Sequence, residues 1–142
     1  MPKNWYLGFK KQNLNTKVIY FSINYDGFFK FHPKHKDDQY VLNLFNKDQE
    51  SDKGIGQKAV GKNCSQIINK LFSKSHKTFV FDSSWDVSNN KKFQNMFIDF
   101  CENVLEKNKI SLDRWLDFRR ENIKKNKSKL FLRNKDFLAL KL

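Results

Sequence analysis

Lysines and glycines are concentrated in a stretch of the chain that contains no acidic residue. Between Asp52 and Asp82 there is no carboxylate, and three glycines precede a predicted helix that begins at Cys64. Backbone N–H groups at a helix N-terminus, together with lysine ammonium groups, can bind an anion such as phosphate. The alternative interpretation is a solvated loop followed by a solvated helix face. The candidate phosphate-binding residues of this stretch are Lys53, Lys58, Lys62, Lys70, Lys74 and Lys77.

Residues 56–63 nearly match the phosphate-binding loop of nucleotide hydrolases, whose pattern is GxxxxGK followed by Ser or Thr. Asn63 stands where the pattern needs the hydroxyl group that binds Mg²⁺. The preceding residues 48–53 are polar, whereas the motif follows directly from a buried strand. We therefore expect no nucleotide hydrolysis and assign no cofactor, and the binding of phosphate by this loop stays an open question.

A second basic cluster covers residues 119–129, where six basic residues accompany the single acid Glu121. It lies at the C-terminal end of a predicted helix, where one or two lysines would already compensate the helix dipole. Because the cluster exceeds that need, contact with a nucleic-acid partner is favoured over dipole compensation alone. Its candidate residues are Arg119, Arg120, Lys124, Lys125, Lys127 and Lys129.

Aromatic and basic residues alternate in residues 28–36. Single-stranded nucleic acid binds surfaces of this kind, with bases stacked on aromatic rings and lysines near the phosphates. In a strand, Phe29 and Phe31 share one face and are the possible stacking residues, whereas Phe28, Lys30 and His32 share the other. The alternative is that one of the two faces simply packs against helices.

No arrangement of residues identifies a catalytic or metal site. The cysteines and histidines lack the spacing of zinc ligands. Asp82, Asp86 and Asp99 could bind Mg²⁺ in a nuclease, but the Asp…Glu-x-Lys pattern of many nucleases does not follow them. A lysine-dependent RNase of toxin type needs no motif, so it remains an alternative. We assign no catalytic residue and no metal ligand.

The composition gives a net charge of +13 and a pI near 9.8. Only four of the 28 basic residues are arginines, and the excess of Lys, Asn and Phe is typical of an AT-rich genome. Glutamate occurs only at Glu50, Glu102, Glu106 and Glu121, so this bias does not account for the whole charge imbalance. Two cysteines make no disulfide framework, and no apolar run approaches a membrane span or a signal peptide. We expect a cytoplasmic protein without membrane contact.

Strand signals dominate residues 4–46. Residues 5–9 are a short apolar run, and residues 17–25 are rich in β-branched and aromatic types. Asp26-Gly27 favours a type I′ turn, which would return the chain into a strand at residues 28–32. Residues 39–45 are a further strand candidate. Together these segments predict an antiparallel meander of three or four strands.

Helix signals follow a predicted glycine- and lysine-rich loop at residues 47–62. We expect a helix at residues 64–74, a buried strand at 78–81, a loop at 83–90 and an amphipathic helix from Phe93. Ser111 is a candidate cap for a last helix whose core residues are Leu112, Trp115, Leu116 and Ile123. A short element at residues 130–142 alternates like a strand after Phe137. The predicted fold class is α+β in a single domain over residues 1–142, with the N-terminal meander packed against two or three C-terminal helices.

These features favour a nucleic-acid-binding protein that contacts phosphates of DNA or RNA with low sequence specificity. Low specificity is expected because four arginines leave few candidates for bidentate reading of guanine. One alternative is a small interaction module of a phage or mobile element that occupies an acidic or nucleic-acid-binding protein. The other alternative is a small nuclease or toxin-type RNase.

Overall fold

A computed structural model describes residues 1–52, 54 and 56–142. Within these residues it contains five α-helices and two three-stranded sheets, and all strand pairs are antiparallel. The predicted α+β class is therefore confirmed. No helix in the described part of the chain is long and apolar enough to cross a membrane.

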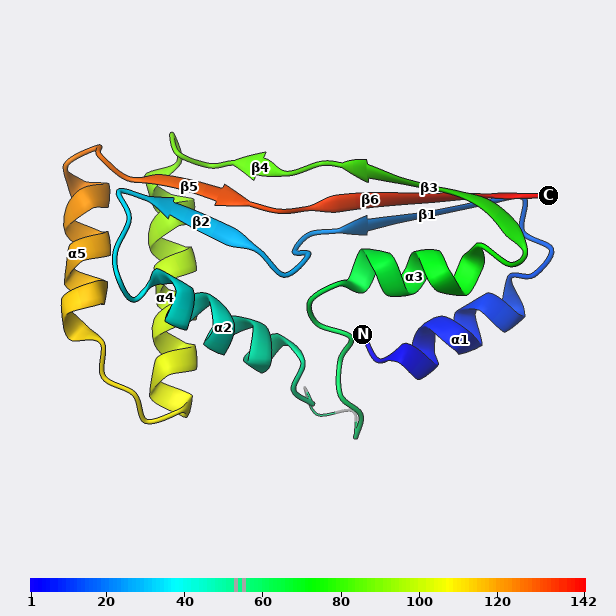
Figure 1. Cartoon of the computed structure of the whole chain (residues 1–142), viewed down its shortest axis with the longest axis horizontal. Coiled ribbons are helices and arrows are strands. Elements are labelled where there is room, and N and C mark those ends of the chain that lie inside the picture. Colours follow the sequence, from blue (N-terminus) through cyan, green and yellow to red (C-terminus); the bar gives the residue numbers. More distant parts are fainter. Residues whose placement is uncertain (53, 55) are drawn as a thin grey trace. The chain divides into compact units, whose positions relative to one another are not determined.

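The chain divides into two compact units, each with its own sheet (Figure 1). The terminal unit comprises Met1–Gly27, Gln49–Ser84 and Arg133–Leu142, and the central unit comprises Phe28–Asp48 and Trp85–Leu132. The single-domain hypothesis concerns independent folding, which this division does not test, and it stays a prediction.

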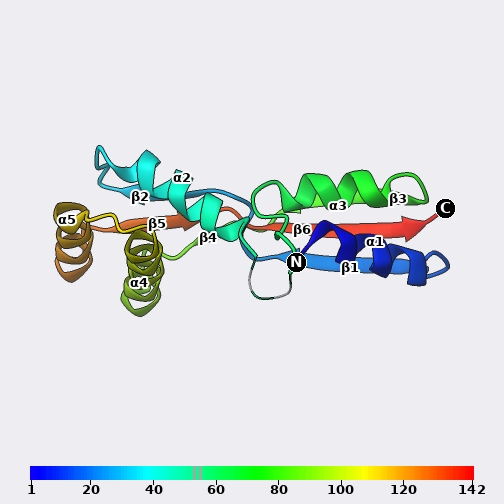
Figure 2. The same ribbon diagram turned by 90° about the horizontal axis from the view of Figure 1, so that it is seen from below.

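The terminal unit packs two helices on one face of its sheet. Its elements are α1 (Lys3–Gln12), β1 (Val18–Ile23), α3 (Cys64–Phe72), β3 (His76–Asp82) and β6 (Lys135–Lys141), and the strand order is β1-β6-β3. Figures 1 and 2 show α1 and α3 side by side across the same face of this sheet. Alternate residues of the strands supply the core beneath the helices, which contains Tyr6, Ile19, Ile23, Ile68, Phe72, Phe137 and Ala139.

The central unit places its helices against a second small sheet. Its elements are β2 (Phe29–His32), α2 (Asp38–Gln49), β4 (Trp85–Asp86), α4 (Lys91–Lys107), α5 (Asp113–Lys124) and β5 (Lys129–Leu132), with strand order β2-β5-β4. Aromatic rings from strand and helices meet in edge-to-face contacts, for example Phe29 with Phe97 at 4.9 Å between ring centroids. Such contacts add to the free energy gained by burying the rings.

Two predicted strands are helices. The apolar run at residues 5–9 lies in α1, where the Trp5 and Phe9 rings stack with centroids 5.3 Å apart. Residues 39–45 lie in α2, which buries Val41, Leu42 and Phe45. In both segments the apolar residues recur at i, i+1 and i+4, which is the spacing of one helix face, and the aromatic content concealed this period.

The predicted hairpin at Asp26-Gly27 is also wrong, although both of its strands are present. β1 pairs with β6, whereas β2 pairs with β5, so the two strands belong to different sheets and form no meander. The Asp26 carboxylate accepts hydrogen bonds from the backbone N–H of Ser65 (3.2 Å) and from its hydroxyl (2.8 Å). Gly27 has a φ of +77°, and a Cβ there would lie 2.5 Å from the Lys62 Cβ, so only glycine fits this approach.

The C-terminal half follows the prediction more closely. The helices expected at residues 64–74, from Phe93 and after Ser111 are α3, α4 and α5, and the last strand is β6. Some details differ. The apolar stripe expected on the helix from Phe93 includes Met96 and Phe100, but both of these side chains are exposed. Ser111 donates to the Asp113 carboxylate instead of capping α5. Val80 and Phe81 of the expected buried strand are also exposed. β3 is an edge strand, and Phe81 lies on the sheet face opposite α1 and α3.

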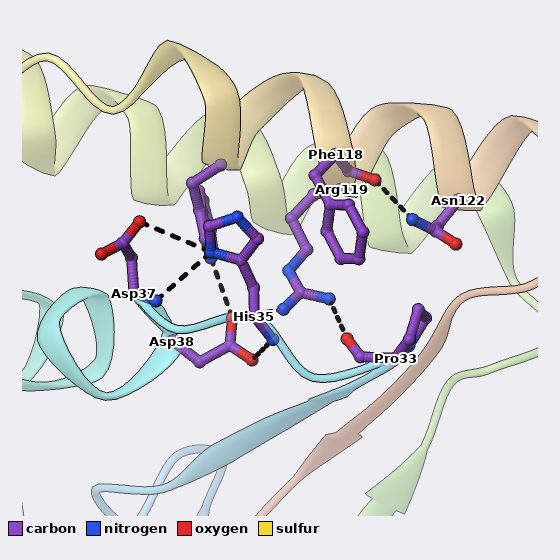
Figure 3. Close-up of polar contacts among 8 residues, drawn as sticks. Pro33, His35, Asp37, Asp38, Phe118, Arg119 and Asn122 are labelled. Carbon is purple, nitrogen blue, oxygen red and sulfur yellow. Dashed lines mark hydrogen bonds and ion pairs between the residues drawn. The ribbon is translucent and has the colours of Figure 1, made fainter.

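A buried ion pair joins α5 to the first residue of α2 (Figure 3). The Arg119 side chain is 0% exposed, donates to the carboxylate of Asp38 and donates to the Pro33 carbonyl at 2.6 Å. Its guanidinium group lies 4.6 Å from the centroid of the Phe31 ring. The same carboxylate accepts from Trp115 Nε1 and from the His35 backbone N–H, both at 2.8 Å. The prediction that Arg119 contacts phosphate is therefore wrong, because this side chain is enclosed by the core.

Replacing Asp38 by alanine should lower the free energy of unfolding by about 3–5 kcal/mol, because Arg119 then keeps a buried charge without its counter-charge. Urea unfolding followed by tryptophan fluorescence measures this loss. Asp37→Ala is the matched control, since the neighbouring Asp37 carboxylate only approaches the His35 ring at 3.5 Å and should cost less than about 1 kcal/mol. Equal losses in the two variants would contradict the central role of the Arg119–Asp38 pair.

Asp26→Ala should destabilise the protein by about 1–3 kcal/mol, because it leaves the first turn of α3 without a buried acceptor. Ser65→Ala removes only the hydroxyl donor and should cost roughly 0.5–1.5 kcal/mol. Thermal and urea unfolding of both variants check the order of the two losses. A greater loss of stability in Ser65→Ala than in Asp26→Ala would show that the Asp26 carboxylate is not the main stabilising acceptor at the first turn of α3.

Candidate nucleic-acid interface

The second predicted cluster forms a structured turn between α5 and β5. The N–H of Asn126 donates to the Ile123 carbonyl at 3.2 Å, and the N–H of Lys127 donates to the Asn122 carbonyl at 2.9 Å. This is the Schellman pattern that ends helices, and it needs a residue with positive φ, here Asn126 at +58°. The hydrogen bonds hold the backbone of the turn in place while its lysine side chains extend into solvent.

Four of the six predicted residues of this cluster are exposed lysines: Lys124, Lys125, Lys127 and Lys129. We call these four residues the lysine turn. Lys125 forms an ion pair with Glu121 at 2.7 Å, and this hydrogen bond lowers the pKa of the glutamate. For Lys124, Lys127 and Lys129, no ion pair occurs with any residue that the structure describes. Most of the positive charge of the turn is therefore directed to solvent.

The two predicted arginines do not join this surface. Arg119 is buried with Asp38. Arg120 is half-buried and donates to Glu102 Oε2 at 2.5 Å and to Asp99 Oδ1 at 3.1 Å. The hydrogen bond to Glu102 is the main cause of a raised pKa of Arg120. Because two acidic residues of α4 already neutralise this guanidinium group, the exposed positive charge of the cluster comes from its lysines.

Lys91 is a basic residue of this site that the sequence did not reveal. Its Nζ donates to the Lys124 carbonyl at 3.3 Å, at the C-terminal end of α5. The ammonium group therefore lies against the helix end that the lysine turn follows. No local signal identified it, because Lys91 begins α4 and lies far from Lys124 in the sequence.

The first predicted cluster lies in the terminal unit. Lys53 falls outside the described residues, and the other five lysines, Lys58, Lys62, Lys70, Lys74 and Lys77, are exposed. They come from the loop, from α3, from the turn after it and from β3. The glycine loop was expected to bind an anion at the N-terminus of α3. The buried Asp26 carboxylate already occupies that position and accepts a hydrogen bond from the Ser65 N–H. A phosphate at this position would be repelled by the carboxylate, so we do not include this loop in the candidate interface.

The predicted stacking residues are buried. Phe29 and Phe31 are 4% and 2% exposed and pack in the aromatic core of the central unit. The prediction that they stack on bases is therefore wrong, because their face of β2 is the one that helices cover. Strand alternation leaves Lys30 and His32 on the opposite, solvent-facing side, as the exposure pattern of β2 shows.

The acidic residues considered for a nuclease have other partners. Asp82 accepts from the Ser84 hydroxyl, Asp86 accepts from the Ser88 hydroxyl, and Asp99 pairs with Arg120. The two serine hydrogen bonds are the main causes of lowered pKa values of Asp82 and Asp86. Across residues 1–52, 54 and 56–142, no group of three or more His, Cys, Asp and Glu side chains could hold a metal ion.

Both cysteines are free thiols in the described structure. Burial raises the pKa of Cys64, whose Sγ lies 3.4 Å from the Tyr6 hydroxyl, and burial also raises the pKa of Cys101. Raised pKa values keep both thiols protonated at neutral pH, and the thiolate is the reactive form. The arrangement therefore provides no activated cysteine nucleophile.

Comparison with known proteins adds no family to this description. No protein-family model matches the chain, and no curated protein has a matching sequence. The interpretation of the site therefore depends on its own residues: an exposed lysine turn on a hydrogen-bonded helix end, next to a sheet face that carries further basic residues.

Proposed function

We propose that this protein binds nucleic acid mainly through phosphate contacts and with low sequence specificity, and that the lysine turn is its principal contact. The observation that supports the proposal most strongly is that four exposed lysines lie within six residues on a hydrogen-bonded turn. One of these lysines, Lys125, forms an ion pair. Each lysine that neutralises a phosphate releases a condensed counterion, and this release provides sequence-independent affinity.

The states of the arginines support low specificity. Specific reading of guanine usually requires an arginine fork in the major groove. Arg119 and Arg120 are held by acidic partners, and Arg133 donates to the backbone carbonyl of Asp26 at 2.9 Å. Three of the four guanidinium groups are therefore engaged within the protein, whereas the fourth, that of Arg114, is exposed. Lysines, which bind phosphate as point charges, are the exposed cations that remain at the turn.

Reversing the charge at Lys124, Lys125 and Lys127 (Lys→Glu at each) should weaken binding and reduce the salt dependence of affinity. Fluorescence anisotropy of labelled DNA and RNA across a salt series measures both quantities. The slope of log K against log salt should fall by about 0.7–0.9 for each phosphate that the protein no longer neutralises.

The matched control reverses three exposed lysines outside both predicted clusters: Lys3, Lys11 and Lys17. It changes the net charge by the same amount, so it separates a local site from the attraction of a positively charged protein. We expect its slope to stay close to that of the unaltered protein. Equal effects of the two triple variants would contradict the lysine turn as the principal contact.

A specific surface supports a second candidate function, the binding of a partner protein. The face of the terminal sheet opposite α1 and α3 carries apolar side chains from all three strands: Val18, Tyr20, Phe79, Phe81, Leu138 and Leu140. Tyr20 is 59% exposed and Phe81 is 49% exposed. Contiguous exposed apolar surface of this kind often marks a protein interface. Absence of nucleic-acid binding at low salt would favour this second function over the first.

A further inference from the structure

The sheet of the central unit has one covered face and one open face. Its covered face is formed by Phe29 and Phe31 of β2 with Leu130 and Leu132 of β5, all of them buried. Figures 1 and 2 show α2 and α4 on this side of the sheet. The alternate residues of the same strands, Lys30 and His32 of β2 with Lys129 and Phe131 of β5, therefore face the opposite side.

Strand register brings an aromatic ring and basic side chains together on the open face. Phe131 lies on the central strand, directly opposite Lys30 of β2 and Asp86 of β4. Two residues along β5, Lys129 lies opposite His32. Side chains directly opposite one another have Cβ atoms about 4.5–5.5 Å apart, so the Lys30 stem lies beside the phenylalanine ring. A hollow lined by these residues together with Phe28 and Ser88 has a volume of about 570 Å³.

Phe131 is 40% exposed, although it occupies the middle strand of its sheet. Its neighbours Leu130 and Leu132 enter the core, so the ring itself is not needed to fill that core. A flat ring on a rigid strand, with cations at its side, has the composition of a base-stacking surface. Stacking of this kind tolerates any base, because every base has a π-face.

Asp86 makes the distribution of charge on the open face uneven. Its carboxylate accepts from the backbone N–H of Ser88 at 3.0 Å and from the Ser88 hydroxyl, and the hydroxyl is the main cause of its lowered pKa. It therefore remains negatively charged at neutral pH and repels phosphates from the β4 edge. Lys30 places positive charge on the side of Phe131 that faces β2. Lys129 lies two residues along β5 on the same face, where its charge also contributes to the lowered pKa of Asp86. A bound phosphate backbone would run past Lys30 and Lys129.

We propose that this open face binds single-stranded nucleic acid, with one base stacked on the Phe131 ring and the flanking phosphates on Lys30 and Lys129. Lys129 also belongs to the lysine turn, so the bound nucleic acid would continue from the sheet onto Lys127 and Lys124. The proposal rests on the nucleic-acid-binding function and defines its ligand class. A duplex cannot use the platform, because its bases are already stacked on both sides and their faces are inaccessible.

The test compares Phe131→Ala with the unaltered protein in binding to labelled oligo(dT) and to a labelled DNA duplex. We expect the affinity for oligo(dT) to fall by roughly 10-fold or more, because the bound base no longer has a ring on which to stack. Affinity for the duplex and the salt slope should not change, because no cation is removed. Phe131→Trp should restore oligo(dT) affinity, and quenching of its added fluorescence by bound oligo(dT) would report stacking directly.

Phe100→Ala is the matched control, since Phe100 is an exposed phenylalanine of the same unit that lies on α4. Unfolding curves of both alanine variants check that the fold is retained. If Phe131→Ala binds oligo(dT) as tightly as the unaltered protein, while the triple variant of the lysine turn does not, the stacking platform is wrong and the phosphate-binding function stands. If the unaltered protein binds neither probe at low salt, both proposals are wrong.

Discussion

The central unit depends on the burial of one guanidinium group. Arg119 extends from α5 into the core, where its charge is balanced by Asp38 and its faces meet the rings of Phe31 and Phe118. A buried charge of this kind is tolerated only when its partner and its hydrogen bonds are in place. The pair therefore fixes α5 relative to β2 and to the start of α2. The lysine turn ends α5 and leads into β5, so its position follows from the same contact.

The two kinds of basic residue have different tasks within one short segment. Arginine is planar and weakly hydrated, and it suits a buried pair that is enclosed by aromatic rings. Lysine is strongly hydrated and keeps its ammonium group in solvent, which leaves it available for phosphate. In residues 119–129 both arginines turn to acidic partners and all four lysines are exposed. The segment thus supports the core from one side of the helix and carries the candidate interface at its end.

Local periodicity predicts the elements of this protein better than their pairing. The long stripe of α4 was recognisable, whereas α1 and α2 were missed because short aromatic runs suit both helix and strand. Arg119 was assigned to the surface by its charge, although it lies four residues from Trp115 and from Ile123, on the buried face of α5. Its spacing was the signal that could have placed it in the core. Phe131 could not be recognised as part of a site, because its partner Lys30 comes from a strand about a hundred positions away.

In the proposed binding mode, the lysine turn and the open sheet face of the central unit form one surface for single-stranded nucleic acid. The most direct test is a titration of the ¹⁵N-labelled protein with oligo(dT), followed by amide chemical shifts at moderate salt. We expect the largest changes at Lys30, Lys127, Lys129 and Phe131, with little change at Tyr20 and Phe81 of the terminal sheet. Changes centred on Tyr20 and Phe81, or spread evenly over the exposed lysines, would contradict this binding mode.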